Sequence, residues 1–165
     1  MSVILLLGGN SGDRLANLRS ALDLISERAG IIKQCSSVYE TAPWGFECRD
    51  SFYNIAIELE SHLDEHTLLC VLLGIEADLG RHRSMNIGYE SRPMDIDIIL
   101  YDDLVVDTPE LQIPHPRMAI RRFVLEPIVQ IAPNRVHPIV NLPMRILLER
   151  CKDELEVKKV GEIFV

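Results

Sequence analysis

The chain lacks the features that would suit it to nucleic acid or to a membrane. Its 17 lysines and arginines form no run and are outnumbered by 25 acidic residues, which gives a net charge of −8. Proteins that bind the phosphate backbone of DNA or RNA carry a basic patch, so we expect no nucleic-acid partner. No apolar stretch approaches the roughly 20 residues that span a bilayer, so we expect no membrane association.

Cysteine is also scarce, and its spacing excludes two kinds of site. The four cysteines are Cys35, Cys48, Cys70 and Cys151. Because none of them forms a Cys-x-x-Cys pair, the sequence contains neither a zinc-knuckle nor a thioredoxin pattern. The apolar run Val3–Leu7 is too short for a signal peptide and resembles a strand. We therefore expect a reduced, cytoplasmic protein. Residues 1–165, 47% of them apolar, suit one domain.

The most informative stretch of the chain is residues 92–101, which has the pattern of a buried strand with two acids at its start. Strict alternation predicts one face formed by Met94, Ile96, Ile98 and Leu100 and an opposite face formed by Asp95, Asp97, Ile99 and Tyr101. Burying an unpaired carboxylate is costly. Two carboxylates roughly 7 Å apart at Cα can converge on one or two divalent cations. The alternative is a solvated strand entrance where the acids pair with Arg92.

The elements around this strand predict the fold class. Apolar and β-branched runs predict strands over Val3–Leu7, Ile31–Thr41 and Phe52–Glu60. Periodic leucines predict one helix that ends at Gly30 and a second that begins at Asp64 or Thr67. Together with the acidic strand, this order is that of an α+β ferredoxin-like βαββαβ sandwich. The remainder is expected to form a C-terminal extension of two short helices and a last strand.

Two groups of side chains could carry chemistry. Basic residues gather in sequence near the acids, and arginines beside a carboxylate-bound metal suit a polyphosphate. The alternative is that they are ordinary surface arginines. Trp44 lies in a Pro/Gly loop, and Phe52, Asn54 and Phe123 could join it around a flat heterocycle, which needs aromatic faces and an amide for its edge. The alternative for Phe52 and Phe123 is a place in the core.

Six motifs in consecutive order resemble a known family. They are Leu7-Gly8-Gly9-Asn10-x-Gly12-Asp13, Ser37-x-Tyr39-x-Thr41-x-Pro43-x-Gly45, Phe52-x-Asn54, Glu76-x-x-x-Gly80-Arg81-x-Arg83, Arg92-x-x-Asp95-Ile96-Asp97-Ile98-Ile99-Leu100, and Pro114-His115-Pro116-x-Met118-x-x-Arg121-x-Phe123-Val124-Leu125. The chain from Leu5 to about Pro133 is similar to the 6-hydroxymethyl-7,8-dihydropterin pyrophosphokinases. The resemblance implies a ferredoxin-like fold and an enzyme of folate biosynthesis. This enzyme would transfer diphosphate from ATP to the hydroxymethyl group of the pterin and release AMP.

The resemblance also implies roles for individual residues. Two Mg²⁺ ions would be held by Asp95 and Asp97, and catalysis would involve both aspartates with Arg81 and Arg92. The nucleotide would be bound by Glu76, Arg81, Arg83, Arg92, Ile96, His115 and Arg121. The pterin would be bound by Thr41, Ala42, Trp44, Phe52, Asn54 and Phe123. We expect small-molecule substrates and a monomer.

The segment before Arg92 departs from the family. Tyr89 stands where a tryptophan is usual, and Glu90 replaces a small residue. We expect the loop Gly80–Ser91 to act as a lid, because it joins the second helix to the acidic strand. Two alternatives remain open for the whole chain. One is a two-metal phosphodiesterase or nuclease, and the other is a non-catalytic ferredoxin-like module that binds a ligand.

Overall fold

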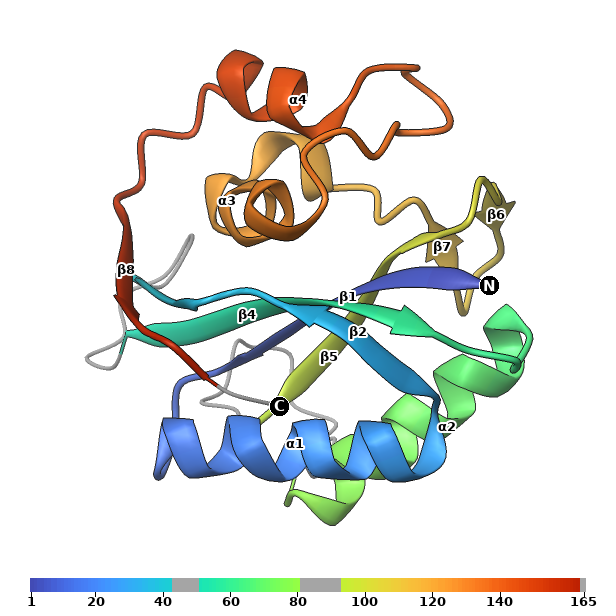
Figure 1. Cartoon of the computed structure of the whole chain (residues 1–165), viewed down its shortest axis with the longest axis vertical. Coiled ribbons are helices and arrows are strands. Elements are labelled where there is room, and N and C mark those ends of the chain that lie inside the picture. The colour runs from blue at the N-terminus through green and yellow to red at the C-terminus, as the bar shows by residue number, and fades with distance from the viewer. Residues whose placement is uncertain (43–50, 81–92, 164–165) are drawn as a thin grey trace.

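A computed structural model of the protein describes residues 1–42, 51–80 and 93–163. Figure 1 shows a twisted main sheet that is covered by helices on both of its faces. The strands are β1 (Ser2–Gly9), β2 (Ile31–Cys35), β3 (Val38–Thr41), β4 (Phe52–Glu60), β5 (Asp95–Tyr101), β6 (Val106–Asp107), β7 (Gln112–Ile113) and β8 (Val157–Gly161). The helices are α1 (Arg14–Arg28), α2 (Glu65–Asp78), α3 (Arg122–Ile131) and α4 (Met144–Arg150), with a 3-10 turn at Met118–Ile120. No helix within these ranges has the length and apolar character needed to cross a membrane.

The main sheet confirms the predicted α+β ferredoxin-like fold. Its strand order is β5-β1-β4-β3-β8, and every pairing is antiparallel. β2 also pairs with β4, so β2 and β3 follow each other along one edge of that strand. The prediction of one unbroken strand over Ile31–Thr41 was wrong at Ser36 and Ser37. There the backbone N–H of Ala56 donates to the Ser36 hydroxyl oxygen at 2.9 Å. In a continuous strand pair this N–H would donate to a backbone carbonyl group instead.

The sheet is buried on both faces, and this explains the uninterrupted apolar run of β1. Val3, Leu5 and Leu7 point into the cluster beneath α1 and α2. Ile4 and Leu6 point into the second cluster, under α3 and α4. A strand that is covered on both sides has no polar face, so its sequence does not alternate. The predicted C-terminal extension therefore covers the sheet face that the βαββαβ core leaves open (Figure 1).

β5 contains a β-bulge that the alternation pattern did not predict. Leu5 pairs with Ile98 and Ile4 pairs with Leu100, so Ile99 is the extra residue. The bulge moves Leu100 into the cluster under α3, whereas Tyr101 returns to the cluster under α1 and α2. The predicted faces are correct through Ile99 and wrong for Leu100 and Tyr101.

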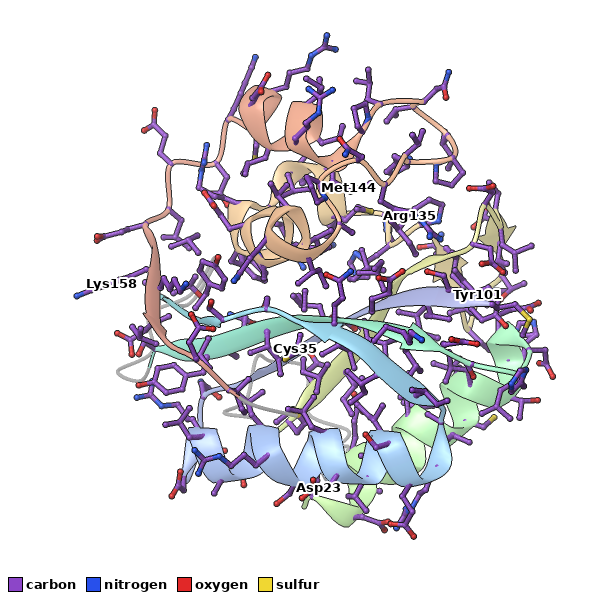
Figure 2. The ribbon with its side chains drawn as sticks, in the orientation of Figure 1. Asp23, Cys35, Tyr101, Arg135, Met144 and Lys158 are labelled. Atoms are coloured by element: carbon purple, nitrogen blue, oxygen red, sulfur yellow. The ribbon has the colours of Figure 1, made fainter. Side chains whose placement is uncertain are left out.

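Two sets of contacts attach the C-terminal part to the sheet. Arg135 bonds Ser2 and the Asp102 carbonyl oxygen, at distances of 2.9–3.2 Å, where β1 begins and β5 has just ended. Figure 2 shows Arg135 on the extension, at the end of the sheet where Tyr101 lies. At the other edge, β8 extends the sheet beside β3, and Glu162 accepts the Ser37 hydroxyl at 2.9 Å. These contacts join the extension to the core.

Two glycines provide a matched test of this packing. A Cβ at Gly30 would overlap the backbone carbonyl oxygen of Glu60, whereas a Cβ at Gly74, within α2, would meet nothing within 4 Å. Gly30→Ala is expected to lower the free energy of unfolding by about 2 kcal/mol or more, because two backbone segments would have to separate. Gly74→Ala is expected to raise it by about 0.5–1 kcal/mol, through better helix propensity. Urea unfolding followed by circular dichroism measures both, and effects of the same sign would contradict the described packing.

Candidate active site

The ends of three adjacent strands bring the predicted polar residues onto one sheet face. Asn54 of β4 lies opposite Gly8 of β1, and Gly8 lies opposite Asp95 of β5. Directly opposed residues in a sheet point to the same side. Asp97 lies opposite Leu6, which belongs to the cluster under α3, so Asp97 also points to that side. The sheet thus places a buried amide and two carboxylates on the face that α3 partly covers.

Gly8 gives the Asn54 side chain room at the centre of this row. A Cβ at this position would collide with the side-chain oxygen of Asn54. That amide is fixed from its other end, because Asn54 Nδ2 donates to Thr41 Oγ1 at 3.2 Å and both side chains are buried. The Asn54 side-chain oxygen therefore lies over Gly8 of β1, the strand between β4 and β5.

The two aspartates line a cleft at the outer edge of β5. The cleft has a volume of about 290 Å³. Asp95 and Asp97 are half-buried in it, beside Glu76 from α2 and His115 from the segment after β7. Ile96 also lines the cleft, although its side chain is buried in the cluster under α1 and α2. The cleft combines carboxylates, an imidazole and apolar walls.

Glu76 has a structural contact that explains its burial. It is only 3% exposed, and its Oε1 accepts the backbone N–H of Ile96 at 2.7 Å. β5 is the terminal strand of the described sheet, so this amide on its outer edge needs a partner other than a strand. Glu76 therefore holds the acidic stretch of β5 against α2. The family resemblance assigns Glu76 to the nucleotide site, and the structure places Glu76 in the wall of the cleft that contains Asp95 and Asp97.

His115 is fixed in position and in tautomer. Its backbone N–H donates to the carbonyl of Ile99, the bulge residue, at 3.0 Å. Its Nδ1 accepts the Arg117 backbone N–H at 3.2 Å, so the neutral ring carries its hydrogen on Nε2. Burial lowers the pKa of His115, and the guanidinium of Arg121 lowers this pKa further, while Asp95 opposes the shift. The imidazole is therefore neutral near pH 7 and donates through Nε2.

Arg121 and Phe123 come from the start of α3. The Arg121 guanidinium carbon lies 5.8 Å from the centre of the Phe123 ring. Phe123 is partly buried against the second cluster. Arg121 is also one of the charges that lower the pKa of His115. The extension thus supplies an arginine, an imidazole and an aromatic ring to the face with the acids.

The other predicted site residues divide into two groups. Phe52 is half-buried at the start of β4, and Ala42 is exposed just after β3. Four predicted residues and the expected lid lie outside the described ranges, and these residues are Trp44, Arg81, Arg83 and Arg92. The cleft also contains residues that the sequence analysis missed, among them Leu69 and Leu73. Their i, i+4 spacing beside the buried stripe of α2 was the available signal.

The donor set fits a magnesium ion that is also bound by phosphate. The described residues contain no group of three or more His, Cys, Asp or Glu side chains that could hold a metal on its own. Mg²⁺ often takes one or two carboxylates and completes its octahedral shell with phosphate and water oxygens. Asp95 and Asp97 suit that kind of shared site, because their side chains lie on one face and line an open cleft.

Comparison with known proteins agrees with this geometry. The family model for 7,8-dihydro-6-hydroxymethylpterin-pyrophosphokinase matches residues 4–133. A Porphyromonas gingivalis protein named 2-amino-4-hydroxy-6-hydroxymethyldihydropteridine pyrophosphokinase is 42% identical over 86% of this chain and 97% of its own length. An Aquifex aeolicus protein of the same name is 37% identical over 87% of this chain and 88% of its own length.

Solved structures show the same fold. A Plasmodium falciparum HPPK-DHPS structure superposes with a TM-score of 0.76 at 18% sequence identity. The match covers 90% of this chain and 45% of the Plasmodium chain, so this chain spans less than half of that protein. From the family match and the curated relatives together, the chain belongs to the 7,8-dihydro-6-hydroxymethylpterin-pyrophosphokinase family.

Proposed function

We propose that this chain transfers a diphosphate group from ATP to the hydroxymethyl group of 6-hydroxymethyl-7,8-dihydropterin and releases AMP, as a step of folate biosynthesis. One observation carries the proposal. The carboxylates of β5 and the buried Asn54–Thr41 pair lie on one sheet face, on either side of Gly8. A site for metal-bound phosphates therefore adjoins a site for a flat polar ligand. The family assignment supports neither a phosphodiesterase nor a non-catalytic module.

The nucleotide would occupy the cleft at the edge of β5. Asp95 and Asp97 would hold two Mg²⁺ ions, whose charge would offset that of the phosphate oxygens. His115 Nε2–H and the Arg121 guanidinium suit the same oxygens as hydrogen-bond donors. Glu76 and Ile96 would form part of the cleft wall. The family motifs assign Arg81 and Arg92 to catalysis and Arg83 to the nucleotide.

The pterin would bind beside Gly8. The Asn54 amide is already oriented by Thr41, so it can pair with a heterocycle edge without losing rotational freedom on binding. Phe52 and Phe123 suit the faces of the ring. The family motifs add Ala42 and Trp44 to this subsite.

The reaction needs positioning more than acid–base chemistry. The hydroxymethyl oxygen forms a bond to the β-phosphorus of ATP, and the bond from that phosphorus to the α,β-bridging oxygen breaks. AMP leaves with the electron pair, and the hydroxyl proton passes to water. Phosphoryl-group transfer of this kind is accelerated mainly by alignment and charge neutralisation.

We also propose that residues 1–165 act as one domain, because both hydrophobic clusters are built on one sheet. We propose in addition that the chain acts as a monomer.

The nucleotide product tests the reaction class. Turnover with Mg·ATP and the pterin alcohol is expected to give AMP as the first nucleotide product, since attack at the β-phosphorus moves two phosphates together. Rapid quenching with anion-exchange chromatography identifies the nucleotide, and phosphorus NMR identifies the pterin diphosphate. Removing Mg²⁺ with a chelator should stop the reaction. ADP as the initial product would show an ordinary kinase and end the proposal.

The aspartates test the metal assignment. Asp95→Asn and Asp97→Asn keep the side-chain shape but remove one negative ligand, so transfer should fall by at least about 10²-fold. The control is Asp103→Asn, an exposed residue in the turn after β5, which should transfer diphosphate at the wild-type rate. Steady-state rates across a Mg²⁺ titration measure the effect, with circular dichroism to verify folding. A folded Asp97→Asn protein with near wild-type rates at limiting Mg²⁺ would contradict the assignment.

Gly8 tests the placement of the pterin. Gly8→Ala should displace the Asn54 amide and weaken pterin binding by about tenfold, which corresponds to roughly 1.4 kcal/mol. Affinity for the nucleotide should change much less, because the added methyl group would meet Asn54 and the Tyr53 carbonyl group. Gly161→Ala, where a Cβ meets nothing within 4 Å, is the matched control. Fluorescence titration of both ligands decides the question, and an equal loss of both affinities would place the pterin elsewhere.

A further inference from the structure

Arg14 makes an unusual set of contacts for a residue at the start of a helix. Its Nη1 donates to both the backbone oxygen and the hydroxyl oxygen of Ser51, each at 2.8 Å. The same nitrogen lies 3.5 Å from the Glu40 carboxylate. The guanidinium carbon also lies 3.7 Å from the centre of the Tyr53 ring, which is cation–π distance. One side chain of α1 therefore contacts residues of two strands and the residue that leads into one of them.

Each partner of Arg14 is a chain neighbour of a residue in the proposed pterin site. Glu40 precedes Thr41 at the end of β3. Ser51 precedes Phe52 at the start of β4, and Tyr53 separates Phe52 from Asn54.

Arg14 acts from the opposite side of the sheet. Asn54 points to the α3 side, so Tyr53, the next residue along β4, points to the α1 side, where it packs against the first cluster. Glu40 lies directly opposite Tyr53 in the β3–β4 pair. Arg14 therefore contacts the ends of β3 and β4 from the α1 side of the sheet, whereas Thr41 and Asn54 lie on the α3 side. Arg14 is not part of the pterin subsite itself.

The base of Arg14 is itself fixed. Asp13 caps α1 by accepting the Ala16 backbone N–H at 3.0 Å, and the Asn17 backbone N–H donates to the Asp13 carbonyl group at 2.9 Å. A guanidinium on this rigid helix end can bond in its plane and stack through its face at the same time, which an ammonium group cannot do. These properties suit a side chain that sets the relative position of two strands.

We propose that Arg14 is a positioning residue for the pterin substrate. By binding Glu40, Ser51 and Tyr53 it holds the ends of β3 and β4 in register, so that Thr41, Phe52 and Asn54 stay in their binding arrangement. This role rests on the proposed function, because it presumes that the pterin binds beside Asn54. It goes beyond that function in assigning substrate affinity to a residue that touches neither substrate.

Substitution at Arg14 separates this role from a purely structural one. Arg14→Ala should raise the dissociation constant of the pterin alcohol by about tenfold or more while that of Mg·ATP changes by less than about twofold. Arg14→Lys keeps the charge near Glu40 but loses the stacking and the paired bonds, so it should recover only part of the affinity. Arg19→Ala, an exposed arginine on the same helix, is the matched control and should match wild type. Fluorescence titration at a temperature where circular dichroism shows a folded variant measures both constants.

The outcomes are distinguishable. An Arg14→Ala protein with a lower melting temperature but an unchanged pterin constant would make Arg14 a stabilising residue only and would overturn the proposal. If that variant does not fold, Ser51→Ala and Tyr53→Leu each remove one contact, and each should weaken pterin binding selectively. No weakening in either would also overturn the proposal. Failure of the wild-type protein to bind the pterin alcohol would overturn the proposed function, and the role of Arg14 with it.

Discussion

The site depends on how the acidic strand is held at the edge of the sheet. β5 has one strand neighbour in the described sheet, β1, so its outer edge would expose backbone groups to solvent or to another chain. Two contacts hold that edge instead. The Glu76 carboxylate accepts from Ile96 at 2.7 Å, and the Ile99 carbonyl accepts from His115 at 3.0 Å. A further strand in this place would fill the cleft, whereas side-chain and loop contacts keep the edge ordered and leave the acids accessible.

The second requirement is that no side chain separates Asn54 from Asp95 on this face, and Gly8 meets it. β1 is the only strand between β4 and β5 in the described sheet, so any side chain at position 8 would stand between Asn54 and Asp95. Glycine is normally unfavourable within a strand because it costs backbone entropy and packs poorly. Its presence after the apolar run Val3–Leu7 allows the close approach of the Asn54 side chain. Flanking strands that are buried on both faces give β1 the packing to tolerate it.

The sequence predicts which segments form helices and strands better than it predicts where a strand breaks or which face each of its side chains occupies. β1, α1 and β4 have long and unambiguous patterns, and alternation alone places the side chains of Asp95 and Asp97 on the same face of β5. The bulge at Ile99 was missed because the residues around it are all apolar. Moving Leu100 and Tyr101 to the opposite faces therefore does not change the apolar pattern of the sequence. The break at Ser36 was missed because small polar residues also occur within strands. The structural role of Glu76 was missed because its partner, the N–H of Ile96, is a backbone group that no sequence pattern shows.

The C-terminal extension is what turns the sheet face into a site. A βαββαβ core covers one face of its sheet and leaves the other open, and here the second cluster closes most of that open face with α3 and α4. The extension is fixed at the end of the sheet where β1 begins, through Arg135, and to the bulge residue Ile99 of β5, through the backbone of His115. The second cluster covers Ile4 and Leu6 but does not include Gly8, two residues further along β1. The packing that buries the sheet therefore stops where the polar residues begin. It also places His115 in the cleft beside Asp95 and Asp97, so the segment that covers the sheet contributes to the proposed site as well.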